Sequence, residues 1–241
     1  NPPLSPELQH LSEWDSRRRL LKERIQKIGA DVVCLQETSP ESFEEDFRFM
    51  REELGYDGCE VFKKGRFRPA TFWRTDRCRL VGAPMHKDRT LLTTFQVGEG
   101  AADRNWHVLN CHLQAGKQGP RRARQILEGV KASVTQARKL KEQDPTSPLL
   151  IVCGDFNGGE ECGAVRFLED GVIGPEFLED GEPVTSKMKS IPTSEVLTDV
   201  VSLIERPAPP TMVVSELISL MVEGSDSTAY DKPKLSSECR A

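Results

Sequence analysis

The sequence predicts an α/β domain, and two observations lead to that prediction. Three apolar runs, at residues 31–35, 108–111 and 149–153, have the length of buried strands, and polar residues follow each of them at once. Other stretches carry apolar residues at spacings of three and four, which is the pattern of helices that cover a sheet. We therefore expect buried strands with helices packed outside them.

The first half of the chain predicts two helices followed by short strands. One helix is expected from Asp15 to Gly29, where the glycine supplies a C-terminal stop. A second is expected between Ser39, as its N-cap, and Gly55. Strands are expected at residues 60–62, 70–74, 78–81 and 91–97. Because no helix separates these strands, we expect an antiparallel meander.

The second half of the chain predicts strands that alternate with helices. A strand at 106–111 leads through a loop at 114–120 into a long amphipathic helix, which ends at Asp144 and Pro145. After the strand at 149–153 we expect a short helix at 162–168 and an acidic, glycine-rich loop at 169–183. A further apolar element is expected at 196–201, and another helix at 211–222.

Composition limits the class of protein. The 241 residues suffice for one well-buried domain, which we place at 1–206, with a C-terminal helix and a disordered tail in 207–241. A formal net charge of −5 means that nucleic-acid binding would have to rest on local clusters of cations. No apolar run approaches the ~20 residues of a membrane span, so we expect no membrane partner. The sequence does not fix the oligomeric state.

The seven cysteines indicate the cellular compartment of the protein. Cys34, Cys111 and Cys153 each lie inside an apolar strand, and an odd number of cysteines in a chain of this length does not suggest a disulfide framework. We expect buried thiols in a reducing compartment, and therefore an intracellular protein, cytoplasmic or nuclear.

Polar residues at the end of the third apolar run suggest a chemical site. Gly154 allows a turn, and Asp155 and Asn157 stand two residues apart, so their side chains project to the same side of an extended segment. A carboxylate can bind a hard cation and an amide can hydrogen-bond an oxyanion, which is what the cleavage of a phosphate ester requires. The alternative is a strand that ends in an Asx turn.

Three strand ends together resemble a known family. They are the motifs Leu35-Gln36-Glu37, Cys111-His112-Leu113 and Gly154-Asp155-Phe156-Asn157. In this order they resemble the endonuclease/exonuclease/phosphatase superfamily, whose fold is like that of deoxyribonuclease I, and the resemblance runs from about Arg17 to about Asp199. It implies two packed mixed β-sheets flanked by helices, a four-layer α/β sandwich, and a metal-dependent hydrolase of phosphodiester bonds.

The resemblance also implies a role for each strand-end residue. Glu37 would anchor a Mg²⁺ ion, for which Mn²⁺ is a possible substitute. His112 would donate to the scissile phosphate, Asp155 would orient or deprotonate the attacking water, and Asn157 would bind the phosphate. The alternatives are a surface carboxylate at Glu37 and a satisfied core histidine at His112.

Two clusters of cations are candidates for substrate binding. Lys63, Arg66 and Arg68 surround an aromatic residue, and Lys117 and Arg121 follow His112. The alternative for both clusters is a solvated loop.

The expected substrate follows from the resemblance. The strand at 70–74 looks most like the poly(A)-shortening exoribonuclease branch, which implies single-stranded RNA as partner, such as a poly(A) end. A DNA nuclease or a phosphatase of the same superfamily, and a catalytically silent scaffold domain, are the alternatives.

Two marks of the superfamily are missing from the chain. Relatives begin with a strand that carries a metal-binding Asn and end with a Ser-Asp-His motif, and no Asp-His pair occurs in these 241 residues. We therefore expect a domain truncated at both ends and inactive as it stands.

Overall fold

Two β-sheets face each other in the part of the chain that the structure describes. The computed structural model describes residues 13–60, 68–97, 105–142, 148–159, 161–171 and 173–184. These residues all belong to one compact unit of the chain. The expected elements at 196–201 and 211–222, and the whole of 207–241, lie outside the described residues.

The first sheet contains three antiparallel strands. β1 (Val32–Thr38) and β2 (Tyr56–Glu60) lie on either side of β3 (Arg68–Arg74). β-Branched and aromatic residues in β3 suit a central strand, and its five middle residues are all buried. Near its C-terminal end β1 loses register with β3, between Leu35 and Thr38.

The second sheet is mixed. β4 (Cys78–Leu80), β6 (Thr90–Val97), β7 (Trp106–His112) and β8 (Leu149–Asp155) follow one another across it, and β5 (Met85–Lys87) also pairs with β6. β7 and β8 are parallel, because the 21-residue helix α5 (Gly119–Lys139) carries the chain back between them. Their C-terminal ends therefore lie at the same edge of the sheet.

Apolar side chains from both sheets meet between them. Trp73 of β3 and Phe95 of β6 lie with their ring centroids 5.5 Å apart, and Val108 of β7 packs in the same cluster. Cys34 and Cys153 pack against this cluster from β1 and β8. A hydrogen bond with Cys153, and then burial, raise the pKa of the Cys34 thiol well above its usual value. The six cysteines among the described residues are free thiols, and they pack as small apolar groups.

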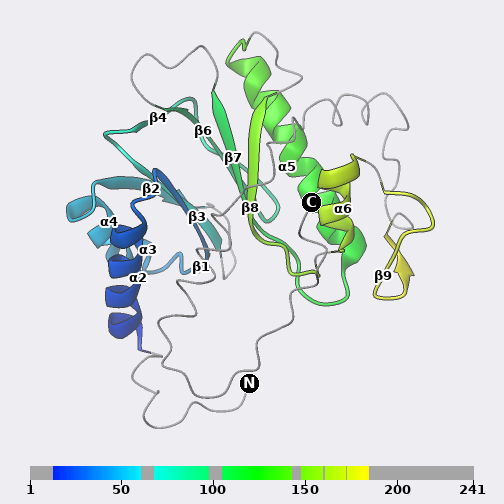
Figure 1. Cartoon of the computed structure of the whole chain (residues 1–241), viewed down its shortest axis with the longest axis horizontal. Helices are drawn as coiled ribbons and strands as arrows, with labels where there is room; N and C mark the ends of the chain where they lie inside the picture. The colour runs from blue at the N-terminus through cyan, green and yellow to red at the C-terminus, as the bar shows by residue number, and fades with distance from the viewer. Residues whose placement is uncertain are drawn as a thin grey trace. The chain divides into compact units, whose positions relative to one another are not determined.

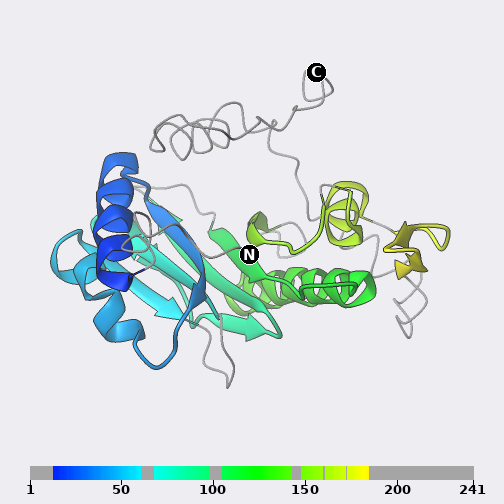
Figure 2. The same cartoon turned by 90° about the horizontal axis from the view of Figure 1, so that it is seen from below.

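Helices cover the outer face of each sheet. α2 (Trp14–Ile28), α3 (Phe43–Asp46) and α4 (Arg48–Glu52) pack on the first sheet through an aromatic cluster around Phe72. α5 and α6 (Gly163–Asp170) pack on the second sheet. Figures 1 and 2 show these two groups of helices on opposite sides of the paired sheets. The predicted sandwich of two sheets flanked by helices is confirmed.

Some expected elements differ from the structure. The helix expected between Ser39 and Gly55 is two short helices, because the backbone at Phe47 leaves the helical region (φ −108°, ψ 15°), and this residue's ring packs against Phe43 and Phe72. The expected meander divides between the sheets, since β3 and β4 belong to different ones. The residues expected to form an acidic loop contain a small hairpin, β9 (Leu178–Glu179) and β10 (Glu182–Pro183). Among the described residues, none of the helices combines the length and apolar character that crossing a bilayer requires.

Candidate active site

The ends of β1, β7 and β8 bring three ionisable side chains together. His112 ends β7, and its Nε2 atom lies 3.6 Å from Asp155 Oδ2 at the end of β8 and 3.9 Å from Glu37 Oε1 on β1. The histidine is buried, whereas the carboxylates of Glu37 and Asp155 are 62% and 45% exposed. Residues 37, 112 and 155, distant in sequence, thus form one cluster with an imidazole at its base and two carboxylates toward solvent.

The pairing of β7 with β8 fixes the position of Asp155 beside His112. The two residues are direct partners in the parallel ladder, and Leu113 N donates to Asp155 O at 2.8 Å. Gly154 makes this approach possible: its φ is +133°, and a Cβ atom there would lie 2.0 Å from the carbonyl oxygen of Cys111. Glycine is therefore required by the close contact between the strands as well as by the turn.

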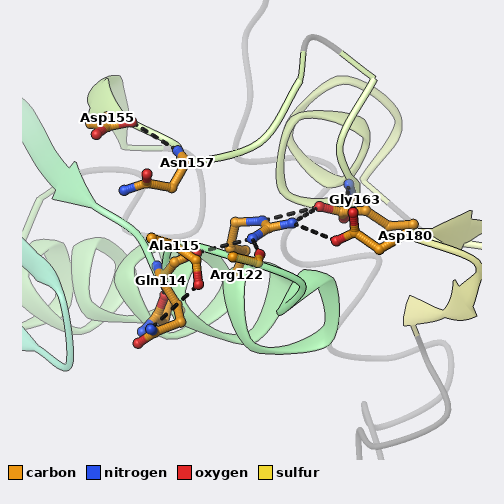
Figure 3. A network of polar contacts seen from close by, with 10 residues as sticks. Gln114, Ala115, Arg122, Asp155, Asn157, Gly163 and Asp180 are labelled. Atoms are coloured by element: carbon orange, nitrogen blue, oxygen red, sulfur yellow. Dashed lines mark hydrogen bonds and ion pairs between the residues drawn. The ribbon is translucent and has the colours of Figure 1, made fainter. Parts of the chain in front are cut away.

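Asn157 is held against the same two strands. Its backbone N–H donates to Asp155 Oδ1 at 2.8 Å (Figure 3). Its side-chain Nδ2 donates to Leu113 O at 3.0 Å. Its φ of 50° is left-handed, a conformation that Asn tolerates better than most residues. The Asx turn of the alternative interpretation is therefore present. It also orients the carboxylate of Asp155 and the amide of Asn157, so the two interpretations of this motif are compatible.

Glu37 lies in a β-bulge. Leu35 pairs with Ala70 and Thr38 pairs with Arg68, so Gln36 and Glu37 together face the single residue Pro69. Proline has no N–H to donate to the ladder, and prolines inside sheets occur at such irregular positions. Glu37 adopts a left-handed backbone conformation with a φ of 61°. The bulge turns the carboxylate out of the regular alternation of β1.

The donor atoms suit a hard cation that keeps most of its water. No group of three or more His, Cys, Asp or Glu side chains forms a metal cage within the described ranges. Mg²⁺ does not require such a cage, since it binds through one or two carboxylates and otherwise keeps water or substrate oxygens. The exposed carboxylate of Glu37, with that of Asp155 across His112, fits this mode of binding.

The predicted substrate-binding cations are only partly described. Lys63 and Arg66 lie outside the described residues. Arg68 begins β3 beside the bulge, where its carbonyl accepts a hydrogen bond from the Thr38 hydroxyl at 2.9 Å. Lys117 is exposed and lines a surface pocket together with Asn157. The exposed Arg121 lies 3.9 Å from Asp88, at the turn between β5 and β6.

Arg122 has a structural role that the sequence did not reveal. It lies in the basic run after His112, yet it is 2% exposed and forms an ion pair with Glu179 of the small hairpin. Its Nη1 atom donates to the carbonyls of Gln114 at 3.0 Å and Gly116 at 2.5 Å (Figure 3). Glu179 in turn accepts a bond from Gly163 N at the start of α6. The charge on Arg122 thus binds protein groups from two segments, the loop after β7 and the small hairpin, and the carboxylate of Glu179 compensates it.

Comparison with known proteins places the chain among nucleases and phosphatases. The model of the Endonuclease/Exonuclease/phosphatase family matches residues 8–172, which is more than half of the chain and contains all three strand-end motifs. The solved structure of ANGEL2, described as a 2′,3′-cyclic phosphatase, superposes with a TM-score of 0.62 at 22% identity, covering 74% of this chain and 55% of that one.

Two curated relatives are similar in sequence. Protein angel homolog 2 of Mus musculus is 26% identical over 192 residues, which cover 70% of this chain and 34% of that protein. Ccr4 of Candida albicans, a 3′-5′-exoribonuclease subunit of the CCR4-Not complex, is 24% identical over 233 residues, which cover 74% of this chain and 29% of that protein. The chain thus spans about a third of the length of the curated relatives it matches.

Proposed function

We propose, because the chain belongs to the Endonuclease/Exonuclease/phosphatase family, that it carries the site of a metal-dependent hydrolase that cleaves phosphodiester bonds in single-stranded RNA. The observation that supports this most directly is the cluster of Glu37, His112 and Asp155. A buried imidazole beneath two exposed carboxylates offers a donor for a phosphate oxygen, a base for water and a ligand for a cation.

The surroundings of each side chain suggest its role in the reaction. Glu37 would hold Mg²⁺, or Mn²⁺ in its place, and the bound ion would neutralise negative charge that develops on the phosphate. His112 is buried, so its ring is held in place, and its Nε2 atom faces the space between the two carboxylates. From there it can donate to a non-bridging phosphate oxygen.

Asp155 and Asn157 would act on the water and on the phosphate. One carboxylate oxygen of Asp155 accepts the backbone N–H of Asn157, which leaves Oδ2, on the His112 side, to orient or deprotonate a water. The amide nitrogen of Asn157 carries two hydrogens, and the Leu113 carbonyl takes one. The second can donate to the phosphate.

RNA is the substrate we propose, for two reasons. Ccr4, a relative, is named an exoribonuclease subunit. In addition, Arg68, Lys117 and Arg121 lie on the segments that border the cluster, where cations can bind the RNA backbone. ANGEL2 is described as a 2′,3′-cyclic phosphatase, so RNA that ends in a 2′,3′-cyclic phosphate is the second candidate substrate.

One substrate panel tests the proposal. The intact protein is incubated with poly(A) RNA, RNA ending in a 2′,3′-cyclic phosphate, abasic DNA and an inositol polyphosphate, each with Mg²⁺, Mn²⁺ or EDTA. We expect hydrolysis of poly(A) RNA that requires the metal ion. Preference for DNA or inositol phosphate would contradict the RNA assignment, and tight RNA binding without any cleavage would favour a silent scaffold domain.

Replacing Glu37 tests its role as the metal ligand. Glu37→Gln removes the charge and keeps the volume, so we expect at least a tenfold higher Mg²⁺ concentration for half-maximal hydrolysis, with thermal stability nearly unchanged. Glu23→Gln, at an exposed position of α2, is the control and should behave as wild type. An unchanged Mg²⁺ dependence in Glu37→Gln would exclude Glu37 as a ligand.

A further inference from the structure

A side chain of the opposite sheet forms hydrogen bonds with the backbone beside the bulge at Glu37. Asn110 lies on β7, two residues before His112, and its side chain is fully buried. Its Nδ2 atom donates to the carbonyl of Leu35 at 3.1 Å and to that of Ala70 at 2.9 Å. These two residues are the last regular pair of the β1–β3 ladder before the bulge. One amide thus holds two strands of the first sheet, β1 and β3, at the point where their register changes.

Gln36 completes this connection. Its side-chain Nε2 donates to Asn110 Oδ1 at 2.9 Å, and Gln36 is the first of the two residues that face Pro69. Two carbonyls on one side and an N–H donor on the other fix the orientation of the Asn110 amide. The pair that precedes the bulge and the first residue of the bulge are therefore both tied to β7, immediately before Glu37 along the chain.

From this geometry we infer that Asn110 is a positioning residue for the metal ligand Glu37, an inference that rests on the proposed function of the site. Gln36 and Glu37 form the bulge and have no one-to-one partner in the register of β1 with β3. Asn110 holds this irregular segment from the other sheet by its hydrogen bonds with Leu35, Ala70 and Gln36. Since it belongs to the same strand as His112, it also fixes the distance between the two halves of the site.

The chemistry of a buried amide makes this assignment specific. An apolar side chain of the same size would fill the same space between the sheets, yet it would remove the hydrogen bonds that the Asn110 amide donates to the carbonyls of Leu35 and Ala70 and the one that it accepts from Gln36. The backbone at Glu37 would then be free to relax from its left-handed conformation. Residues that orient a metal ligand from behind typically change metal affinity by 10–100-fold when replaced.

The test compares two buried asparagines of one segment. Asn110→Leu removes the amide at the bulge. Asn105→Leu removes a buried amide just before β7, at the end of the strand opposite to His112, where Asn105 donates to Glu142 at 2.8 Å. Both variants are made in the intact protein. The Mg²⁺ dissociation constant is measured by calorimetry, and backbone hydrogen exchange is followed at residues 36–38.

We expect Asn110→Leu to weaken Mg²⁺ binding at least tenfold and to speed exchange at residues 36–38, while Asn105→Leu matches wild type within about twofold in both. In a Glu37→Gln background the Asn110→Leu change should have no further effect on Mg²⁺ binding. Gln36→Met is a milder variant at a half-buried position, and if Asn110→Leu does not fold, it should reproduce both effects more weakly.

The outcomes separate the inference from the proposed function. Equal Mg²⁺ affinity and equal exchange in wild type and in the bulge variants would overturn the positioning role. A wild-type protein that hydrolyses none of the phosphodiesters would overturn the proposed function only. If wild type binds no Mg²⁺, the exchange at residues 36–38 decides: faster exchange in Asn110→Leu than in Asn105→Leu supports the inference, and equal exchange overturns it.

Discussion

At the scale of single residues, the proposed chemistry depends on the contact between His112 and Asp155. Their side chains lie 3.6 Å apart, and each is anchored through the backbone pairing of β7 with β8. Asp155→Asn removes a base and His112→Ala removes a donor, so we expect turnover to fall by at least ~10²-fold in either variant. Thermal stability should change far less for Asp155→Asn, whose carboxylate is half exposed.

Single-turnover hydrolysis of labelled RNA by the intact protein measures the two variants. Asp170→Asn, at the exposed end of α6, is a matched carboxylate control and should keep wild-type turnover. If either Asp155→Asn or His112→Ala keeps near-wild-type turnover with a normal melting temperature, that residue is structural.

The sequence predicted some residues of the site and not others, for a physical reason. Glu37, His112, Asp155 and Asn157 each follow an apolar run, so a polar residue in that position is conspicuous. Asn110 lies inside such a run, and only the structure shows that its amide crosses to the other sheet. Arg122 was indistinguishable from its solvated basic neighbours, because its partner Glu179 lies 57 residues away.

At the scale of elements, Arg122 joins the loop after β7 to the hairpin β9–β10 and the start of α6. The side chains of Arg122 and Glu179 are only 3% and 10% exposed. Arg122→Met would leave Glu179 as an unpaired buried carboxylate, so we expect the free energy of unfolding to fall by about 3 kcal/mol or more. Chemical denaturation measures this loss.

Two further variants check the explanation. Arg124→Met, at an exposed position of the same helix, should change the free energy of unfolding by no more than about 0.5 kcal/mol. Adding Glu179→Gln to Arg122→Met should restore part of the loss, because the buried charge is then gone. An Arg122→Met protein as stable as the Arg124→Met protein would show that the pair contributes little.

Helices and strands with a long pattern of apolar residues were predictable from the sequence, and very short strands were not. The expected bounds of the helix that ends at Gly29, and of the strands β3, β6, β7 and β8, agree with the structure to within a few residues. β5, β9 and β10 contain two or three residues each, which is too few for an alternating pattern to stand out. The break at Phe47 depends on packing against β3, which no local pattern encodes.

At the scale of the whole molecule, one buried histidine links stability to pH. His107 is fully buried; its Nε2 lies 2.8 Å from Glu142 Oε1 and its Nδ1 lies 3.1 Å from the Thr94 hydroxyl, an arrangement that suits the neutral ring. Burial lowers the pKa of His107 below its usual value. The unfolded chain therefore binds more protons near pH 6, and the free energy of unfolding falls as pH drops below about 6.5.

Melting temperatures between pH 8 and pH 5.5 test this expectation. Wild type should lose stability progressively over the lower part of that range, and His107→Gln, although less stable at pH 8, should lose less on acidification. The same pH slope in both proteins would mean that His107 does not control it.

The division of the site between two sheets has a consequence for the order of folding. His112 and Asp155 belong to one ladder, so they can come together as soon as β7, α5 and β8 assemble. Glu37 joins them only when the other sheet docks, through contacts such as Gln36 with Asn110 that close a loop of 74 residues. An intermediate with the second sheet formed would hold the proposed base and donor without the proposed metal ligand. Under the proposed function, affinity for the metal would then arise in the last step of folding, and a half-folded chain would be inactive.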